Sequence, residues 1–178
     1  MRYWQAGILA AFVWVAADGA RAQFRDVTDC AKLQIRLTGI PEAGGARCDG
    51  DENAYDETID ASGPGSIFVI RHQSTIERTY FWRLKAAEIV DRLTASAQVE
   101  SRSEEFEVED FNVMRYRATP SGKDSPSACF AFVRYAGHVA HTTGYRHSVV
   151  GFYCDLTGNA PTDARIGELL GAIDADFW

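Results

Sequence analysis

The sequence predicts an α+β domain of two layers, in which an antiparallel sheet of about four to five strands is covered by helices. Short apolar or alternating segments recur in the second half of the chain and are joined by short polar loops, as is typical of antiparallel strands. A long segment, about residues 75–97, and a short one after Pro161 have the apolar spacing of helices.

The first 22 residues have the pattern of a secretory signal peptide. Arg2 provides a positive start, residues 6–17 form an uninterrupted apolar run, and residues 20–22 (ARA) have the small-x-small pattern that signal peptidase reads. The apolar run is too short to span a bilayer. We therefore expect cleavage after residue 22 and one exported domain over 23–178.

The chain contains four cysteines, which in an exported protein favour disulfides. We expect the pairs Cys30–Cys48 and Cys129–Cys154. The segments around Cys129 and Cys154 have the pattern of two hairpin strands with a turn near 141–144, and directly opposed residues of such strands lie within disulfide reach. A zinc site is disfavoured because no C-x2-C pair is present.

The first part of the predicted domain contains one clear strand. Residues 24–40 are ambiguous between a short helix and a strand, and residues 41–66 form a long polar loop rich in glycine. Residues 67–71 (IFVIR) are a compact apolar run between turn signals, which predicts a strand.

The most regular apolar pattern predicts a long helix over about residues 75–97. Ser74 and Glu77 have the spacing of a capping box at its start. The apolar stripe expected to face the sheet consists of Ile76, Tyr80, Leu84, Ala87 and Val90.

The C-terminal half predicts strands followed by a short helix. Residues 104–118 alternate, with a change of parity at 109–110 that indicates a bulge or a turn between two strands. The hairpin that contains the second cysteine pair follows. Residues 161–163 (PTD) then begin a helix with apolar positions at Ile166, Leu169, Leu170 and Ile173.

The charge of the chain restricts its partners and its compartment. The formal net charge is −7, which disfavours nucleic acid and anionic membrane as partners. Arginine greatly outnumbers lysine, as in GC-rich genomes, and the chain has no Asn-x-Ser/Thr acceptor for N-glycosylation. We therefore expect the periplasm of a Gram-negative bacterium, with no membrane span after the signal.

An acidic segment over residues 49–60 resembles the calcium loop of EF-hand proteins. The resemblance implies at most a weakly bound Ca²⁺, because Ala54 replaces the turn glycine, Asp56 replaces an apolar residue and no helix precedes the loop. The alternative is an acidic loop that is only solvated. The oxygen ligands that the resemblance implies are Asp49, Asp51, Asn53 and Asp60.

A second candidate site is a sheet region rich in arginine, tyrosine and histidine, next to an acidic segment at 99–110. Guanidinium groups bind carboxylate or phosphate in a bidentate way, and tyrosine stacks or donates hydrogen bonds. The alternative is an ordinary polar face whose arginines pair with the acidic strand. The expected contact residues are Arg115, Arg117, Arg134, Tyr135, Arg146 and His147.

These observations favour a non-enzymatic binding domain of the cell envelope whose partner is an envelope protein or an anionic polymer. No catalytic residue is predicted, since the sequence motifs of hydrolases and nucleotide-binding enzymes are absent. The turn residues His138 and His141, with His147, could hold zinc or copper but lack further ligands. The alternative function is a small secreted hydrolase acting on envelope material, with calcium as a candidate stabilising ion.

Overall fold

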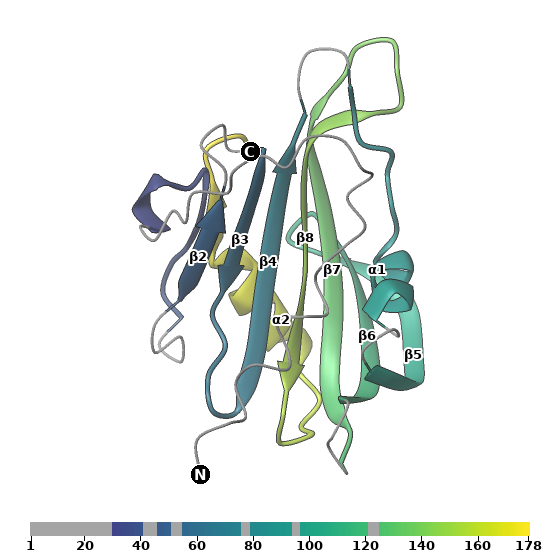
Figure 1. Ribbon diagram of the computed structural model, residues 1–178. Coiled ribbons are helices and arrows are strands. Elements are labelled where there is room, and N and C mark those ends of the chain that lie inside the picture. The colour runs from purple at the N-terminus through teal and green to yellow at the C-terminus, as the bar shows by residue number, and fades with distance from the viewer. Residues whose placement is uncertain (1–29, 41–45, 51–54, 76–78, 94–96, 121–124) are drawn as a thin grey trace, which may run out of the picture.

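A seven-stranded antiparallel sheet forms the centre of the structure, with strand order β2-β3-β4-β8-β7-β6-β5 (Figure 1). A second, two-stranded sheet pairs β1 with β9. The computed structural model describes residues 30–40, 46–50, 55–75, 79–93, 97–120 and 125–178. The elements are a 3₁₀ turn Cys30–Lys32, β1 Ile35–Leu37, β2 Arg47–Gly50, β3 Asp56–Asp60, β4 Ser66–Ser74, α1 Ala86–Leu93, β5 Ala97–Val108, β6 Phe111–Pro120, β7 Ser127–His138, β8 Tyr145–Asp155, α2 Asp163–Gly171 and β9 Ile173–Ala175.

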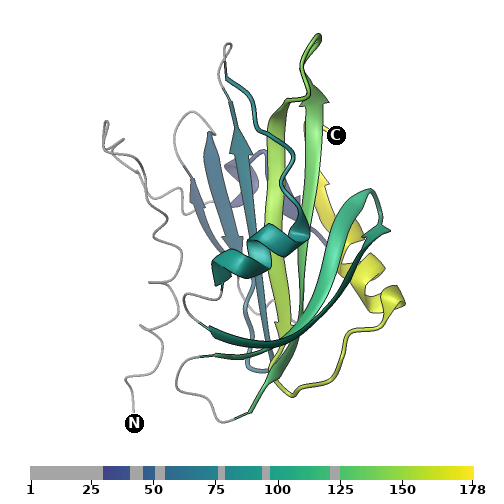
Figure 2. The ribbon, with the colours of Figure 1, turned by 90° about the vertical axis from the view of Figure 1, so that its right-hand side faces the viewer.

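The two faces of the large sheet are covered by different elements (Figure 2). α1 packs on one face, over β5, β6 and β7, and we call this the α1 face. α2 and the small β1–β9 sheet pack on the other, the α2 face. Because successive side chains of a strand point to opposite faces, each central strand contributes to two separate apolar clusters. The sheet is therefore the middle layer of the domain.

Aromatic rings fill the α2 face. Phe68 meets Phe132 and Tyr153 edge to face, with ring centroids 6.1 and 6.0 Å apart. Phe132 in turn meets Phe111 at 5.6 Å. Edge-to-face pairs at these separations add to the free energy gained by removing the rings from water. The strands that contribute these rings are distant in sequence, so this cluster holds the centre of the sheet together.

The long helix expected over 75–97 is wrong. Only α1 is helical in the described part of that segment, and the domain is mostly β instead of an α+β layer with a long helix. Ser74 is the last residue of β4, and residues 79–85 are extended. Phe81 donates its backbone N–H to the Tyr145 carbonyl at 2.8 Å and accepts one from Tyr145 at 3.1 Å. An aromatic run fits such a half-buried extended segment well.

Side chains from neighbouring strands determine where α1 begins. The backbone N–H of Ala86 donates to Asn112 Oδ1 at 3.2 Å, and that of Ala87 donates to Glu105 Oε1 at 2.9 Å. The first N–H groups of a helix have no partner within the helix, so these long-range acceptors stabilise this start.

The sheet also has more strands than the four to five expected. The segment 41–66, expected to be a polar loop, contains β2 and β3. These strands are short and polar on one side. β3 pairs with β4 and β2 pairs with β3, and this pairing rather than their own pattern makes them strands.

Several expected elements are confirmed. The strand at 67–71 lies within β4, and the parity change at 109–110 is a tight turn between β5 and β6. Glu109 and Asp110 both have positive φ, of 51° and 64°, as two-residue hairpin turns require. α2 begins after Thr162, whose side chain accepts a hydrogen bond from the Arg165 N–H as an N-cap. It ends at Gly171, so Ile173, expected on this helix, is instead the first residue of β9.

Both expected disulfides are present. Cys30 and Cys48 have Cα atoms 5.4 Å apart, and Cys129 and Cys154 have Cα atoms 4.1 Å apart. The second pair lies directly opposed in the β7–β8 register, as expected. Two disulfides fit an extracellular or otherwise oxidising environment.

Two further findings concern membrane-spanning helices and the expected segments that the structure does not describe. Among the residues that the structure describes, no helix is long and apolar enough to cross a membrane. The expected signal peptide at 1–22 and Glu77 of the expected capping box lie outside the described residues.

The close approach of β4 and Phe132 to Gly151 generates a testable prediction. A Cβ at position 151 would lie 2.2 Å from the Val69 carbonyl oxygen and 2.5 Å from Phe132 Cζ. We expect Gly151→Ala to lower the free energy of unfolding by about 3 kcal/mol or more in urea denaturation, because backbone must move. Gly65→Ala, which has no atom within 4 Å of the new Cβ, is the control and should change stability by less than about 0.5 kcal/mol.

Candidate functional site

Three polar side chains lie in a row on the α2 face, next to its apolar cluster. Glu57 of β3 lies directly opposite His72 of β4 in the strand register, and His147 of β8 follows on the next strand. His72 Nδ1 is 2.9 Å from Glu57 Oε2, and His72 Nε2 is 3.2 Å from His147 Nδ1. We call these three residues the Glu–His–His row.

The inner part of the row is completely buried. His72 and Glu57 are 0% and 1% exposed, and His147 is partly exposed. The other carboxylate oxygen of Glu57 accepts the backbone N–H of Gln34 at 2.8 Å. Within the described residues, every buried side-chain nitrogen and oxygen has a hydrogen-bond partner. Burial of polar groups is tolerated in a core when they are fully paired in this way.

The row has one open end. Both ring nitrogens of His72 and one of His147 are used inside the protein, which leaves His147 Nε2 as the atom able to exchange a proton with the exterior. Burial lowers the pKa of His147 below its ordinary value, and the nearby His72 and Arg146 lower it further. His147 is therefore kept neutral more readily than an isolated histidine.

Phe177 covers the row, and Trp178 packs beside it. The Phe177 ring stacks on both imidazoles with centroids 4.3 Å away, at interplanar angles of 18° to His72 and 5° to His147. The Arg134 guanidinium lies 3.8 Å from the centroid of the Trp178 ring, a cation–π contact. The segment after β9 thus covers the row with the Phe177 ring, and the Trp178 ring packs on Phe177 and Phe111 beside it.

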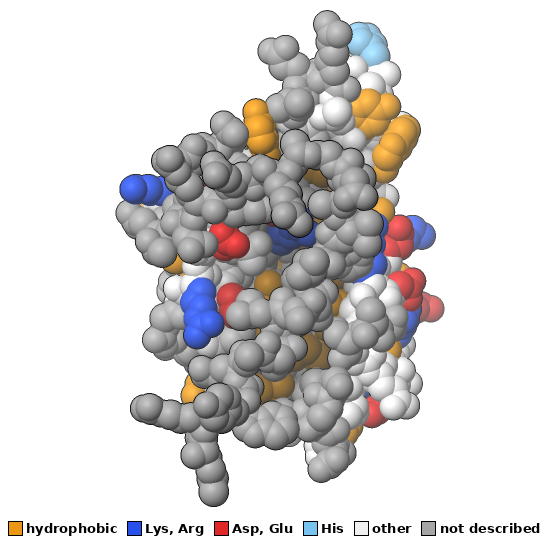
Figure 3. All heavy atoms as spheres, viewed as in Figure 1, with side chains coloured by type: hydrophobic (Ala, Val, Ile, Leu, Met, Phe, Trp, Pro, Cys, Tyr) orange, Lys and Arg blue, Asp and Glu red, His pale blue; other side chains and the backbone are white. Residues whose placement is uncertain are grey.

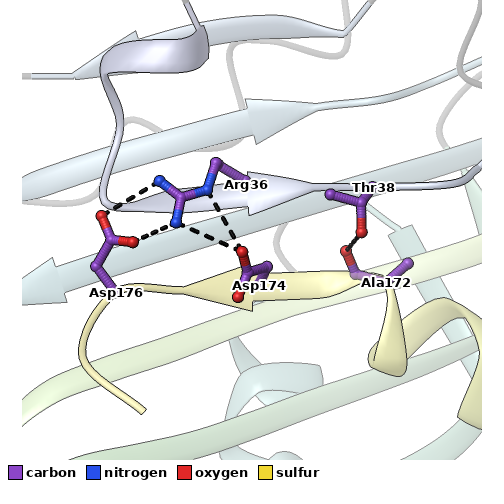
Figure 4. A network of polar contacts seen from close by, with 5 residues as sticks. All are labelled: Arg36, Thr38, Ala172, Asp174 and Asp176. Atoms are coloured by element: carbon purple, nitrogen blue, oxygen red, sulfur yellow. Dashed lines mark hydrogen bonds and ion pairs between the residues drawn. The ribbon is translucent and has the colours of Figure 1, made fainter.

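A cluster of charges holds β9 in place beneath this cover (Figure 4). Arg36 of β1 forms ion pairs with Asp174, at 3.4 Å, and with Asp176. The hydrogen bond from Arg36 lowers the pKa of the Asp176 carboxyl, and the same bond raises the pKa of Arg36. The Thr38 hydroxyl also donates to the Ala172 carbonyl at 3.3 Å. These contacts position the segment that carries Phe177.

The six residues of the expected arginine-tyrosine-histidine face do not form one surface. Four belong to strand positions that face α2, and two, Tyr135 and Arg146, belong to positions that face α1. Arg115 forms an ion pair with Asp163, and Arg134 lies 3.3 Å from Asp110. The four residues on the α2 side are Arg115, Arg117, Arg134 and His147.

The structure places two residues of the expected calcium loop. Asp49 lies in β2 opposite Thr58, and Asp60 lies in β3 opposite Arg47. Asp60 Oδ1 accepts a hydrogen bond from the Ser62 N–H at 3.0 Å. The other expected ligands, Asp51 and Asn53, lie outside the described residues. A search of the described residues for three or more ligating side chains that could hold a metal finds no such group, and this includes the described histidines.

A second feature is an aromatic cluster at one end of the molecule, formed by residues 79–85 and the hairpin end 135–146. We call these two segments the tip; Figure 3 shows hydrophobic side chains gathered at its upper right, where the tip lies. Trp82 is 64% exposed, and its ring lies 5.2 Å from that of Tyr80. Tyr80 is fixed against the backbone of Gly144, where a Cβ would lie 2.1 Å from the ring.

The tip differs in charge from the rest of the chain. Its two segments contain no aspartate or glutamate, although the whole chain has a net charge of −7. Arg83 and Lys85 are exposed, and Arg146 is partly exposed. In the described part of the chain none of these three forms an ion pair. The tip is therefore a basic and aromatic surface.

Sequence reasoning missed most of both features. Glu57 and His72 lie on separate strands, and only the strand register shows that they are neighbours. Tyr80 belongs to the apolar stripe that predicts a helix, and Trp82 lies within the same predicted helix. A usable signal was the absence of acidic residues from the segments that flank the hairpin turn.

Comparison with protein-family models finds no match, and searches of curated proteins and of solved structures find none either. The functional argument therefore depends on the residues of this chain alone.

The pairing of Glu57 in the core generates a prediction about stability. We expect Glu57→Ala to lower the free energy of unfolding by about 2–4 kcal/mol in urea denaturation, because His72 and the Gln34 N–H lose a buried acceptor. The control is Glu107→Ala on the exposed side of β5, which should change stability by less than about 0.5 kcal/mol. Equal effects of the two variants would contradict the role of the row in the core.

The lowered pKa of His147 generates a prediction about pH. The folded protein binds fewer protons than the unfolded chain near the ordinary histidine pKa of 6.5, so its stability rises with pH there. We expect the free energy of unfolding to fall by up to about 1 kcal/mol as the pH drops below about 6.5, with allowance for solvent screening of a half-exposed group. Denaturation curves from pH 7.5 to 5.5 measure this change, and His147→Gln should reduce it.

Proposed function

We propose that this protein is an exported, periplasmic binding domain without catalytic activity, and that its tip contacts an acidic segment of another envelope protein. The observation that carries the proposal is the exposed Trp82 beside Arg83 and Lys85, in two segments that contain no aspartate or glutamate. The disulfides and the pattern of the first 22 residues support export.

The residue types of the tip support a protein partner. Tryptophan, tyrosine and arginine are the residues most enriched among those that dominate binding energy at protein interfaces. Tyr80 packs against Gly144, and the Trp82 ring contacts Tyr80, so part of the side-chain freedom is already lost before binding. A large exposed aromatic side chain in a fixed position is well suited to anchor a partner.

The charge of the tip supports an acidic partner. Arg83, Lys85 and Arg146 carry positive charge on a chain that is negative as a whole. Complementary charge mainly accelerates association and excludes wrong partners, and it makes binding weaken with added salt. A neutral or basic partner would not be attracted by these positive charges.

The alternative function, a small hydrolase, draws on one observation. The Glu–His–His row brings a carboxylate and two imidazoles together from three strands, which is one part of an acid–base site. The Phe177 ring lies over both imidazoles, however, where a substrate would need to approach. This cover favours the binding function over hydrolysis.

Binding of poly-L-glutamate, measured by calorimetry at low and at physiological salt, tests the proposal. We expect binding that weakens with salt. We also expect the affinity to fall by about fivefold or more in the single variant Trp82→Ala, and by as much in the double variant Arg83→Ala/Arg146→Ala. Arg115→Ala, whose guanidinium pairs with Asp163 on the other face, is the control and should bind as the parent does. Binding of alginate in preference to poly-L-glutamate would identify an anionic polysaccharide instead. An affinity that none of these substitutions in the tip changes would refute the role of the tip.

A further inference from the structure

We propose that Glu57, His72 and His147 form an acid-operated latch, which holds Phe177 and Trp178 at neutral pH and releases them in acid. This inference is independent of the proposed binding function, because none of these five residues belongs to the tip. It depends on the number of protons that the Glu–His–His row can hold and on the position of the Phe177 ring.

The two contacts of the row have a fixed capacity for protons. The Glu57–His72 contact holds one proton, and the His72–His147 contact holds one. His147 Nε2 can carry one more without loss of either hydrogen bond. A further proton would have to enter a contact that already holds one, which sets two N–H groups against each other and breaks the His72–His147 bond. In that state both imidazoles are cations with centroids 5.5 Å apart.

Phe177 depends on the contact that this last proton breaks. Its ring lies parallel to both imidazoles at 4.3 Å and so spans the His72–His147 hydrogen bond. A stacked phenyl ring attracts a cation, but it also excludes the water that two adjacent cations need. Repulsion between the cations acts on both rings at once in a desolvated site, so we expect His147 to turn toward solvent and Phe177 to lose its support.

The charged groups around the row favour the same outcome. Arg146 precedes His147 on β8, and Arg134 lies on β7 beneath Trp178, so neighbouring strands supply additional positive charge. Glu57 is the carboxylate of the row itself, and it contacts His72. The charged groups on the same side as the row and its cover are Glu57 on β3, Arg134 on β7 with its partner Asp110, Arg36 on β1, and Asp174 and Asp176 on the segment that carries Phe177. Arg146 points to the α1 face, and its charge acts on His147 from there.

The release is confined to the two aromatic residues. Asp176 is ion-paired with Arg36, and its backbone N–H donates to the Gln34 carbonyl at 3.1 Å. This carboxylate stays ionised at pH values where histidines take up protons, because its partner favours the charged form. β9 therefore remains attached while Phe177 and Trp178 leave the sheet.

Nuclear magnetic resonance of the isotope-labelled full chain tests the latch between about pH 7.5 and pH 4.5, a range that includes the ordinary histidine pKa near 6.5. We expect the contact signal between the Phe177 and His147 rings to be lost on acidification, together with the resolved signal of the Trp178 indole. The hydrogen-exchange protection of the Asp176 amide should be kept. Loss of that protection in step with the ring contact would mean general unfolding and would overturn the proposal.

Variants separate the row from other histidines. His147→Gln cannot become a cation, so its Trp178 signal should not change with acid. His138→Gln, an exposed histidine of the same hairpin, is the matched control and should keep the transition. If His147→Gln does not fold, the protonation of the imidazole nitrogens of His72 and His147, followed by nuclear magnetic resonance in the unmodified protein, tests the latch instead. Release must then coincide with double protonation of both His72 and His147, and release at any other pH, or a tighter Phe177 contact in acid, would overturn the latch.

Discussion

The antiparallel pairing of β4 with β8 is the constraint on which the rest of the structure depends. It joins a three-stranded part, β2-β3-β4, to a four-stranded part, β8-β7-β6-β5, and runs from Ser66 opposite Asp155 to Ser74 opposite His147. A shift of one residue would turn every side chain of β4 to the other face. The pairing places Ile70 opposite Gly151, which leaves room for the Phe132 ring, and it places His72 within reach of His147.

The Glu–His–His row makes this register costly to change. A buried carboxylate is stable in the core only while its hydrogen-bond partners are in place. Any other alignment of β3, β4 and β8 would leave Glu57 without His72 and the core with an unpaired polar group. The apolar rings of the α2 face supply most of the driving force for folding, and the polar row selects one register among the alternatives that those rings would allow.

The same strand, β8, connects the two features that are relevant to function. Tyr145 and Arg146 lie in the tip, and His147 follows directly as the open end of the row. The tip stands on a hairpin that the Cys129–Cys154 disulfide and long backbone pairing keep rigid. The sheet carries the row and the base of the tip, and the Phe81–Tyr145 bridge fastens residues 79–85 to the end of β8. A binding surface on such a support loses less freedom when it contacts a partner than one on an unattached loop.

The sequence alone predicted what depends on local pattern. The two disulfides, the β7–β8 register, the turn at 109–110 and the cap of α2 follow from alternation, spacing and turn residues that are close together in the chain. Tertiary structure decided the rest. Residues 79–85 have helical spacing but lie extended, because Tyr145 supplies backbone partners and Gly144 a place for Tyr80. The meeting of Glu57, His72 and His147 was beyond local reasoning, since nothing in their immediate neighbours specifies which strands pair.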